Sequence, residues 1–105
     1  MISYCNANDA ARMAKEYWNE KERKAKEAAD KLFPEVMICV NDEIISAASI
    51  GQGKCTIDIF RLSNCSDIRC RRYLREKVEK ELTETLGYRI VACCDIIDIV
   101  WCTDV

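Results

Sequence analysis

Histidine is absent from this 105-residue sequence, proline occurs once, and glycine occurs three times. Without an imidazole, the chain lacks the commonest general base and the residue that completes mixed cysteine–histidine zinc sites. Long hydrophobic runs are also missing. The longest reach about five residues, far short of the roughly 20 that cross a bilayer, so we expect no membrane partner.

Cysteine, in contrast, is abundant: there are eight, and none has the C-x2-C spacing of zinc ribbons and redox sites. The first residues form neither a basic nor an apolar segment, so we expect no secretory leader and a cytoplasmic protein. In that reducing compartment the thiols should stay free and pack as small hydrophobic groups, with no metal and no other cofactor. A disulfide framework, a redox sensor and a distant-cysteine metal cluster remain alternatives. The cluster would use Cys65, Cys70, Cys93 and Cys94.

Composition predicts one globular domain over residues 1–105. Half of the residues are hydrophobic and 32% are charged, whereas disordered chains are poorer in hydrophobic residues. The formal net charge is −2. The overall charge therefore gives no reason to expect nucleic acid or an anionic membrane as a partner.

Residues 7–33 are predicted to form one long helix. Asn6 or Asn8 can cap it, Asp9 suits its first turn, and neither glycine nor proline interrupts it. Its apolar residues follow a 4-3 spacing that only Lys21 breaks. These residues are Ala7, Ala11, Ala14, Trp18, Ala25, Ala28 and Leu32.

The length of this helix predicts a homo-oligomer. At 1.5 Å per residue it is ~39 Å long, whereas a compact domain of this size is ~33 Å across. The helix should overhang its own core and offer Trp18 and Ala25 to a second subunit. The turn at residues 21–24 should be solvated.

Pro34 is predicted to stop this helix, and an α/β core is predicted over residues 35–102. Residues 35–50 fit a second helix that ends before Gly51, although residues 36–40 alone also suit a strand. Residues 55–59 alternate like a strand. A third helix begins after residues 63–67 and ends at Gly87. Its buried side should carry the apolar residues that recur every four positions, which are Cys70, Leu74, Val78, Leu82 and Leu86.

The last residues, 88–102, contain two apolar runs around Asp95 and are predicted to form a hairpin, although Cys94-Asp95 is a poor turn sequence. The expected order is helix-helix-strand-helix-strand-strand. This order predicts an α+β fold of two layers, with three helices packed on a small three-stranded sheet.

The best candidate for a ligand site is a cluster of arginines at the start of the third helix. Guanidinium groups bind phosphates in a bidentate manner, and a helix N-terminus favours anions. The alternative is a solvated face that Glu76 and Glu79 partly neutralise. The cluster consists of Arg69, Arg71, Arg72 and Arg75.

Other patterns point to ordinary structural roles. Gly51-Gln52-Gly53-Lys54 leads from a helix into a strand, the reverse of a phosphate-binding loop, so it should cap the helix. Asp58, Asp95 and Asp98 could converge at the sheet as the carboxylates of a metal-dependent nuclease, but Asp58 and Asp98 alternate with apolar residues, as solvent-facing strand positions do. Tyr88 and Trp101 should anchor the core or an interface, because aromatic residues dominate interface energetics.

Several structural motifs give the chain a resemblance to small uncharacterised accessory proteins of bacteriophages and prophages of low-GC Gram-positive bacteria. Those proteins have a helix ending in Ala-Ala and Gly, a helix ending in Gly-Tyr, and a closing hairpin with a terminal Ile-x-Trp. The matching residues here are Ala47, Ala48, Gly51, Gly87, Tyr88, Ile99 and Trp101.

The resemblance implies an accessory protein that acts on host machinery, and it offers no catalytic residues to carry over to this chain. We therefore predict a non-enzymatic binding protein that sequesters a host factor, for example as an anti-defence protein. The factor would be either a protein, bound through Trp101 and the long helix, or a nucleotide signal, bound through the arginines. A nucleic-acid-binding regulator that uses the same arginines is the alternative.

Overall fold

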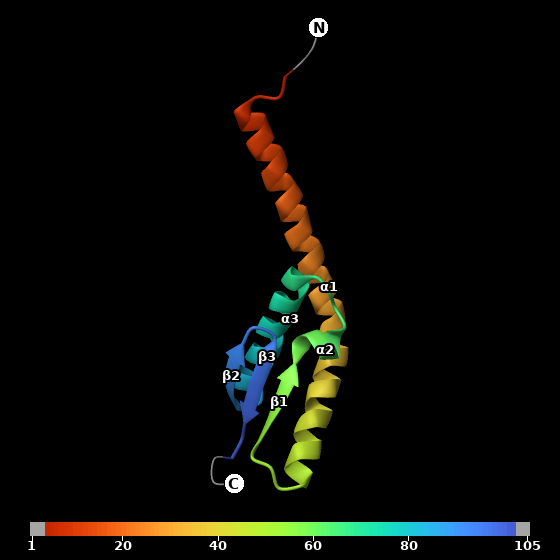
Figure 1. Ribbon diagram of the computed structural model, residues 1–105, viewed down its shortest axis with the longest axis vertical. Helices are drawn as coiled ribbons and strands as arrows, with labels where there is room; N and C mark the ends of the chain where they lie inside the picture. Colours follow the sequence, from red (N-terminus) through yellow and green to blue (C-terminus); the bar gives the residue numbers. More distant parts are fainter. Residues whose placement is uncertain (1–3, 103–105) are drawn as a thin grey trace.

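A computed structural model describes residues 4–102 and is dominated by one long helix, α1 (Ala7–Ser49) (Figure 1). The Asn6 side chain caps it by accepting a hydrogen bond from the Asp9 amide at 2.9 Å. Its 43 residues imply a length of about 65 Å. The molecule measures 75 × 21 × 20 Å, so the predicted overhang is present.

The predicted stop at Pro34 is wrong, because α1 runs through this residue. Proline removes one backbone hydrogen bond and crowds the preceding turn. Here, however, Ala29 and Val36 are buried on either side of it in the same core, while Pro34 itself is exposed. Packing along this face therefore outweighs the local penalty. Residues 35–49 are helical, close to the predicted range, with Ile50 as the C-cap and Gly51 in a left-handed conformation just beyond it.

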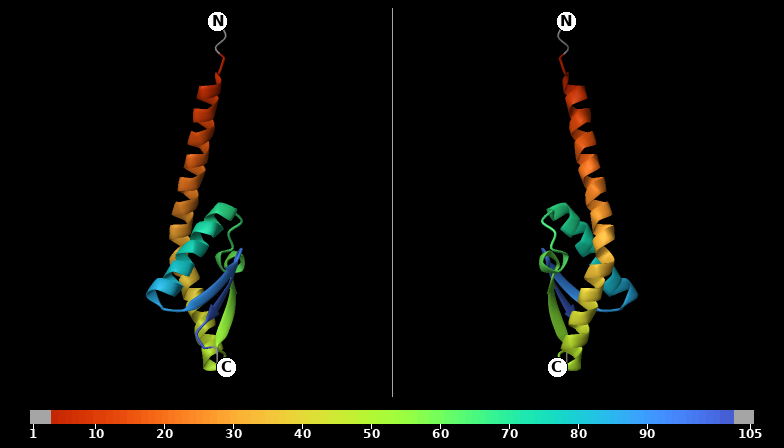
Figure 2. Two further views of the ribbon diagram at one scale, coloured as in Figure 1. Left: turned by 90° about the vertical axis from the view of Figure 1, so that its left-hand side faces the viewer. Right: turned by 90° about the vertical axis from the view of Figure 1, so that its right-hand side faces the viewer.

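The remaining elements form a sheet and shorter helices. They are β1 (Lys54–Asp58), α2 (Ile59–Ser63), α3 (Ile68–Lys80), the single π-type turn η1 (Glu81–Thr85), β2 (Arg89–Cys93) and β3 (Ile96–Val100). The sheet has the order β1-β3-β2, and both strand pairs are antiparallel. The lower half of α1 and α3 cover one face of the sheet, as the views in Figure 2 show. This arrangement confirms the predicted α+β class with three helices and a three-stranded sheet.

The core lies between these two layers. In α3 and η1 it takes Cys70, Leu74, Val78 and Leu82, as the four-residue spacing predicts. Leu86, the last member of the predicted series, is instead 50% exposed, because it lies beyond η1. From the sheet it takes isoleucines on the helix-facing side. These are Ile57, Ile97 and Ile99.

The strand predicted for residues 55–59 ends one residue early. The Asp58 carboxylate accepts a hydrogen bond from the Phe60 amide at 3.0 Å, so this residue caps α2 and does not stay available on the sheet. Asp67 caps α3 in the same way by accepting from the Arg69 amide, which confirms the predicted start of the third helix.

The predicted closing hairpin is confirmed as β2 and β3, joined by a turn at Cys94-Asp95. The backbone of this turn explains why these two residues are an unusual turn sequence. Cys94 has φ of 54°, a left-handed conformation that costs a non-glycine residue about 1–2 kcal/mol. Contacts from elsewhere hold the turn. Arg75 donates to the Cys94 carbonyl at 2.6 Å, and the Ile59 amide donates to the Asp95 carbonyl at 2.8 Å.

Candidate functional site

Arg71, one of the four arginines predicted to contact a ligand, is tied to its own chain. Its Nε lies 3.2 Å from Oδ2 of Asp95, and its Nη1 donates to the Cys65 carbonyl at 2.9 Å. The guanidinium also lies over the Phe60 ring, 4.8 Å from its centroid. Because the side chain is only 12% exposed, these contacts make Arg71 a tie between α3, α2 and the hairpin.

Arg75 has a similar structural role. Besides its bond to Cys94, it pairs with Glu79 on the same helix, with Nε and the carboxylate 3.6 Å apart. Two of the four arginines are therefore engaged in holding the hairpin turn against α3.

Arg69 and Arg72 converge on Glu22 of α1. Their guanidinium nitrogens lie 3.2 and 3.6 Å from Oε1 of Glu22, and the Tyr73 hydroxyl donates to the other oxygen. The prediction of a solvated turn around residue 22 is wrong at this position, because the Glu22 side chain is only 35% exposed. Sequence spacing carries no signal for this contact, since its partners are about fifty residues away.

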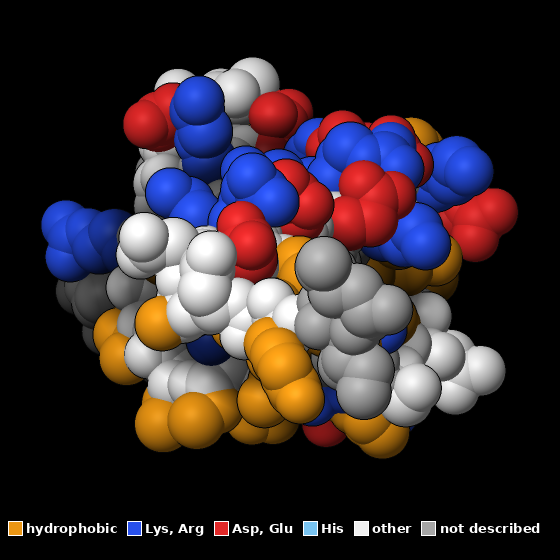
Figure 3. All heavy atoms as spheres, turned by 90° about the horizontal axis from the view of Figure 1, so that it is seen from above, with side chains coloured by type: hydrophobic (Ala, Val, Ile, Leu, Met, Phe, Trp, Pro, Cys, Tyr) orange, Lys and Arg blue, Asp and Glu red, His pale blue; other side chains and the backbone are white. Residues whose placement is uncertain are grey.

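A groove of about 290 Å³ lies over these groups. Its lining consists of Ile68, Arg69, Arg72, Arg75, Cys94 and Asp95. Acidic side chains pair with each of the four arginines, and Figure 3, viewed from the N-terminal end, shows lysine and arginine interspersed with acidic groups. Arg72, whose side chain is 50% exposed, is the most open of the four. The groove therefore offers much less free positive charge than the sequence suggests.

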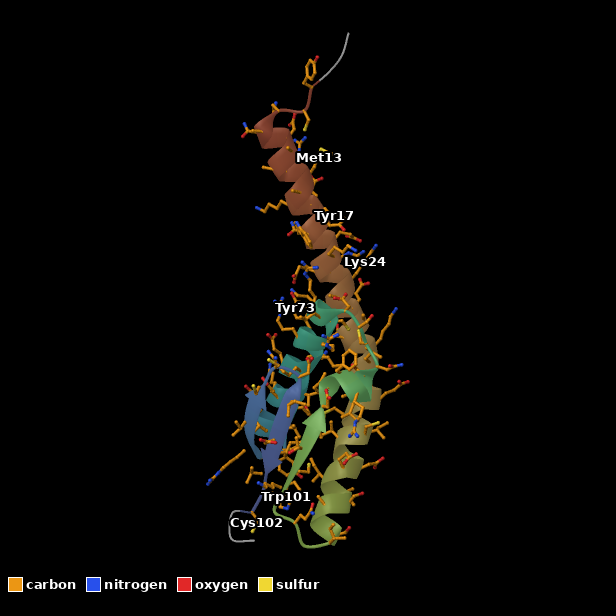
Figure 4. The ribbon with its side chains drawn as sticks, viewed as in Figure 1. Met13, Tyr17, Lys24, Tyr73, Trp101 and Cys102 are labelled. Carbon is orange, nitrogen blue, oxygen red and sulfur yellow. The ribbon has the colours of Figure 1, made fainter. Side chains whose placement is uncertain are left out.

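Residues 7–21 of α1, which we call the arm, project beyond the N-terminus of α3 (Figure 1). Large hydrophobic side chains are exposed on it: Met13 at 61%, Tyr17 at 55% and Trp18 at 49%. Figure 4 shows Met13 and Tyr17 on this segment, away from the body of the protein. The Tyr17 and Trp18 rings meet edge to face with centroids 5.2 Å apart, and Arg69 lies 4.4 Å above the Trp18 ring.

The arm continues the face of α1 that is buried lower down. Ala25 and Ala29 lie in the core, and helical spacing places Trp18 in line with them about two and three turns earlier. Ala14 and Ala11 extend the same line toward the N-terminus. A hydrophobic face made for packing thus runs on past the end of α3 into solvent.

The predicted interface residues have different environments. Trp18 is half exposed on the arm, whereas Ala25 is 2% exposed in the chain's own core and is not available to a second subunit. Trp101 donates from Nε1 to the Gln52 carbonyl at 2.9 Å, and its ring meets that of Tyr88 edge to face, 6.2 Å between centroids. Trp101 lies at the opposite end of the molecule from the arm (Figure 4), so the pair packs at the base of the sheet.

The cysteines are free thiols, and most do not pack as predicted. Cys70 alone is fully buried, and burial together with the adjacent Cys65 raises the pKa of its thiol to about 12. Four others are exposed: Cys5, Cys39, Cys93 and Cys94. Among residues 4–102, no three cysteine, aspartate or glutamate side chains are grouped closely enough to hold a metal ion.

The remaining acidic and glycine candidates are structural. Asp98 accepts a hydrogen bond from Thr56 at 2.6 Å on the open face of the sheet, and Asp58 caps α2. The carbonyl of Gly53 accepts hydrogen bonds from the amides of Trp101 and Cys102. This glycine therefore ties the start of β1 to the end of β3, which is a structural role.

Within the described residues, no helix is both long enough and apolar enough to cross a bilayer. Comparisons with protein-family models, with curated proteins and with solved structures give no match to this chain.

Proposed function

We propose that this chain is a non-enzymatic binding protein that captures a helix of a partner protein on its arm. The observation that carries the proposal is the exposure of the Met13, Tyr17 and Trp18 side chains on the arm, no residue of which belongs to the core that the described residues form. Aromatic residues in such positions contribute much of the energy of protein interfaces.

The shape of the arm favours a helical partner. Alanines at positions 7, 11 and 14 lie in line with Trp18 and leave little bulk beside it, so another helix can approach closely along the side of the arm that these alanines form. The arm carries three basic and three acidic residues, which cancel. These are Arg12, Lys15, Lys21, Asp9, Glu16 and Glu20.

Binding to the arm should therefore depend on hydrophobic burial and respond weakly to salt. Covering the exposed halves of Met13 and Tyr17 is worth about 1 kcal/mol each, so removing both side chains should weaken binding by about 30-fold. A nucleic-acid complex through Arg69 and Arg72 would instead weaken steeply as salt rises.

The biological role proposed is sequestration or inhibition of a host factor, in the manner of phage accessory proteins. Sequestration requires affinity and stoichiometric amounts but no general base, which suits a histidine-free chain whose acidic groups serve as caps and ion pairs. The arm supplies the binding surface that this role needs.

The test is co-purification from host cells with matched variants. Met13→Ala/Tyr17→Ala removes two of the three large exposed hydrophobic side chains of the arm, and Lys15→Ala/Glu16→Ala changes two charged residues of the same arm. The proposal expects one protein to be retained stoichiometrically by the wild type and by the control but lost from the Met13/Tyr17 variant. Equal retention by both variants would refute the proposal, as would loss of the bound species on nuclease treatment.

A further inference from the structure

Strand β2 forms an outer edge of the sheet. Within the described residues it pairs with β3 alone, and Figure 1 shows no element beyond it on the other side. The backbone groups that point away from β3 thus meet no neighbouring strand.

The register identifies those backbone groups. The two-residue turn at Cys94-Asp95 joins Cys93 to Ile96, which makes this a hydrogen-bonded pair. Because such pairs alternate along an antiparallel ladder, Val91 also bonds to β3, whereas Ile90 and Ala92 direct their N–H and C=O groups outward.

This edge lacks the usual protection against strand pairing. Native edge strands are blunted by lysine, proline, charges or bulges. The other edge strand, β1, carries Lys54 and Asp58, but the only charge in β2 is Arg89 at its first position. Its side chains are largely open, with Val91 67% exposed and Ala92 exposed as well.

We propose that β2 pairs antiparallel with β2 of a second copy of this chain, on a twofold axis that passes beside Val91. In this register Ile90 faces Ala92 of the second copy. The N–H group of each residue then donates to the C=O group of the other, which gives four backbone hydrogen bonds across the axis. The two sheets become one continuous sheet of twice the width.

A second copy fits this edge because the strand is complementary to itself about Val91. The outward donors and acceptors lie symmetrically on either side of this residue, and the two exposed valines meet across the axis. Arg89 faces Cys93 of the second copy, so no like charges oppose each other. The pairing does not use the arm, and the axis would direct the two arms in opposite directions.

Sedimentation under reducing conditions tests the inference with two substitutions at one position. Ala92→Pro removes an outward N–H and leaves the bonds to β3 intact, so it should give a folded monomer, with folding checked by circular dichroism. Ala92→Thr keeps the N–H and should remain a dimer. A monomeric wild type, or a dimer that persists in Ala92→Pro, would overturn the inference.

The register is tested by charge exchange at Val91. Val91→Lys and Val91→Glu should each be monomeric, because like charges then face each other across the axis, and an equimolar mixture should form a mixed dimer. A mixture that stays monomeric would overturn this register. Neither substitution touches the arm, so partner capture by a monomeric Ala92→Pro variant would show that the proposed function stands even where the pairing is lost.

Discussion

Arg71 should be a stabilising tie, and its neighbour Arg72 provides a matched control. Both residues lie on α3. The variants Arg71→Met and Arg72→Met each remove one guanidinium group and keep an unbranched side chain. Arg71 is 12% exposed and Arg72 is 50% exposed. Any change in helix propensity is therefore common to both variants, and the difference between them reports the buried contacts.

The magnitude follows from these contacts. Arg71→Met leaves the partly buried carboxylate of Asp95 and the carbonyl of Cys65 without their donor, a loss of about 2–3 kcal/mol. Arg72→Met removes one exposed ion pair to Glu22, worth about 0–1 kcal/mol.

Urea unfolding followed by circular dichroism measures the difference directly, and the midpoint of thermal unfolding should differ by about 10 °C between the two variants. If both variants lose the same stability, or if Arg71→Met loses none, the assignment of Arg71 as a tie between α3 and the hairpin is refuted.

Three further outcomes are expected. Gly53→Ala should destabilise by about 3 kcal/mol in urea unfolding, since its Cβ would overlap the carbonyl oxygen of Cys102; unchanged stability would contradict this close approach. Cys94→Gly should stabilise the protein by about 1 kcal/mol by relieving its positive φ, and a loss of stability would argue against that conformation. Cys70 should be the last thiol to react with a disulfide reagent, because burial raises its pKa to about 12. Because the pKa of Cys70 is higher in the folded state, the protonated thiol favours folding at pH values below about 9, and this contribution is lost as the pH rises toward 12. The free energy of unfolding should therefore fall less steeply over this pH range in Cys70→Ala than in the wild type.

Local patterns predicted much of the fold. The four-residue spacing of Leu74, Val78 and Leu82 identified the buried side of α3, and Gly87, with φ of 77°, marks the end that the sequence indicated. Pro34 misled the prediction because a local helix breaker was outweighed by packing against distant residues.

The candidate site was harder to predict because its character depends on contacts between distant segments. The spacing of the arginines showed a basic cluster, but nothing in the sequence brings Glu22 to Arg69, or Asp95 to Arg71. The overhang of α1 could be predicted from its length, whereas which of its residues stay exposed depended on where α3 begins.

Site-specific photocrosslinking along the arm tests the central claim most directly. A photoreactive residue is placed in turn at the hydrophobic positions 10, 13 and 17 and at the polar positions 12, 16 and 19, and the chain is expressed in host cells. The account predicts adducts with one protein at the first set and none at the second. Adducts of equal yield at both sets, or none at either, would contradict the claim that this face of the arm binds a partner.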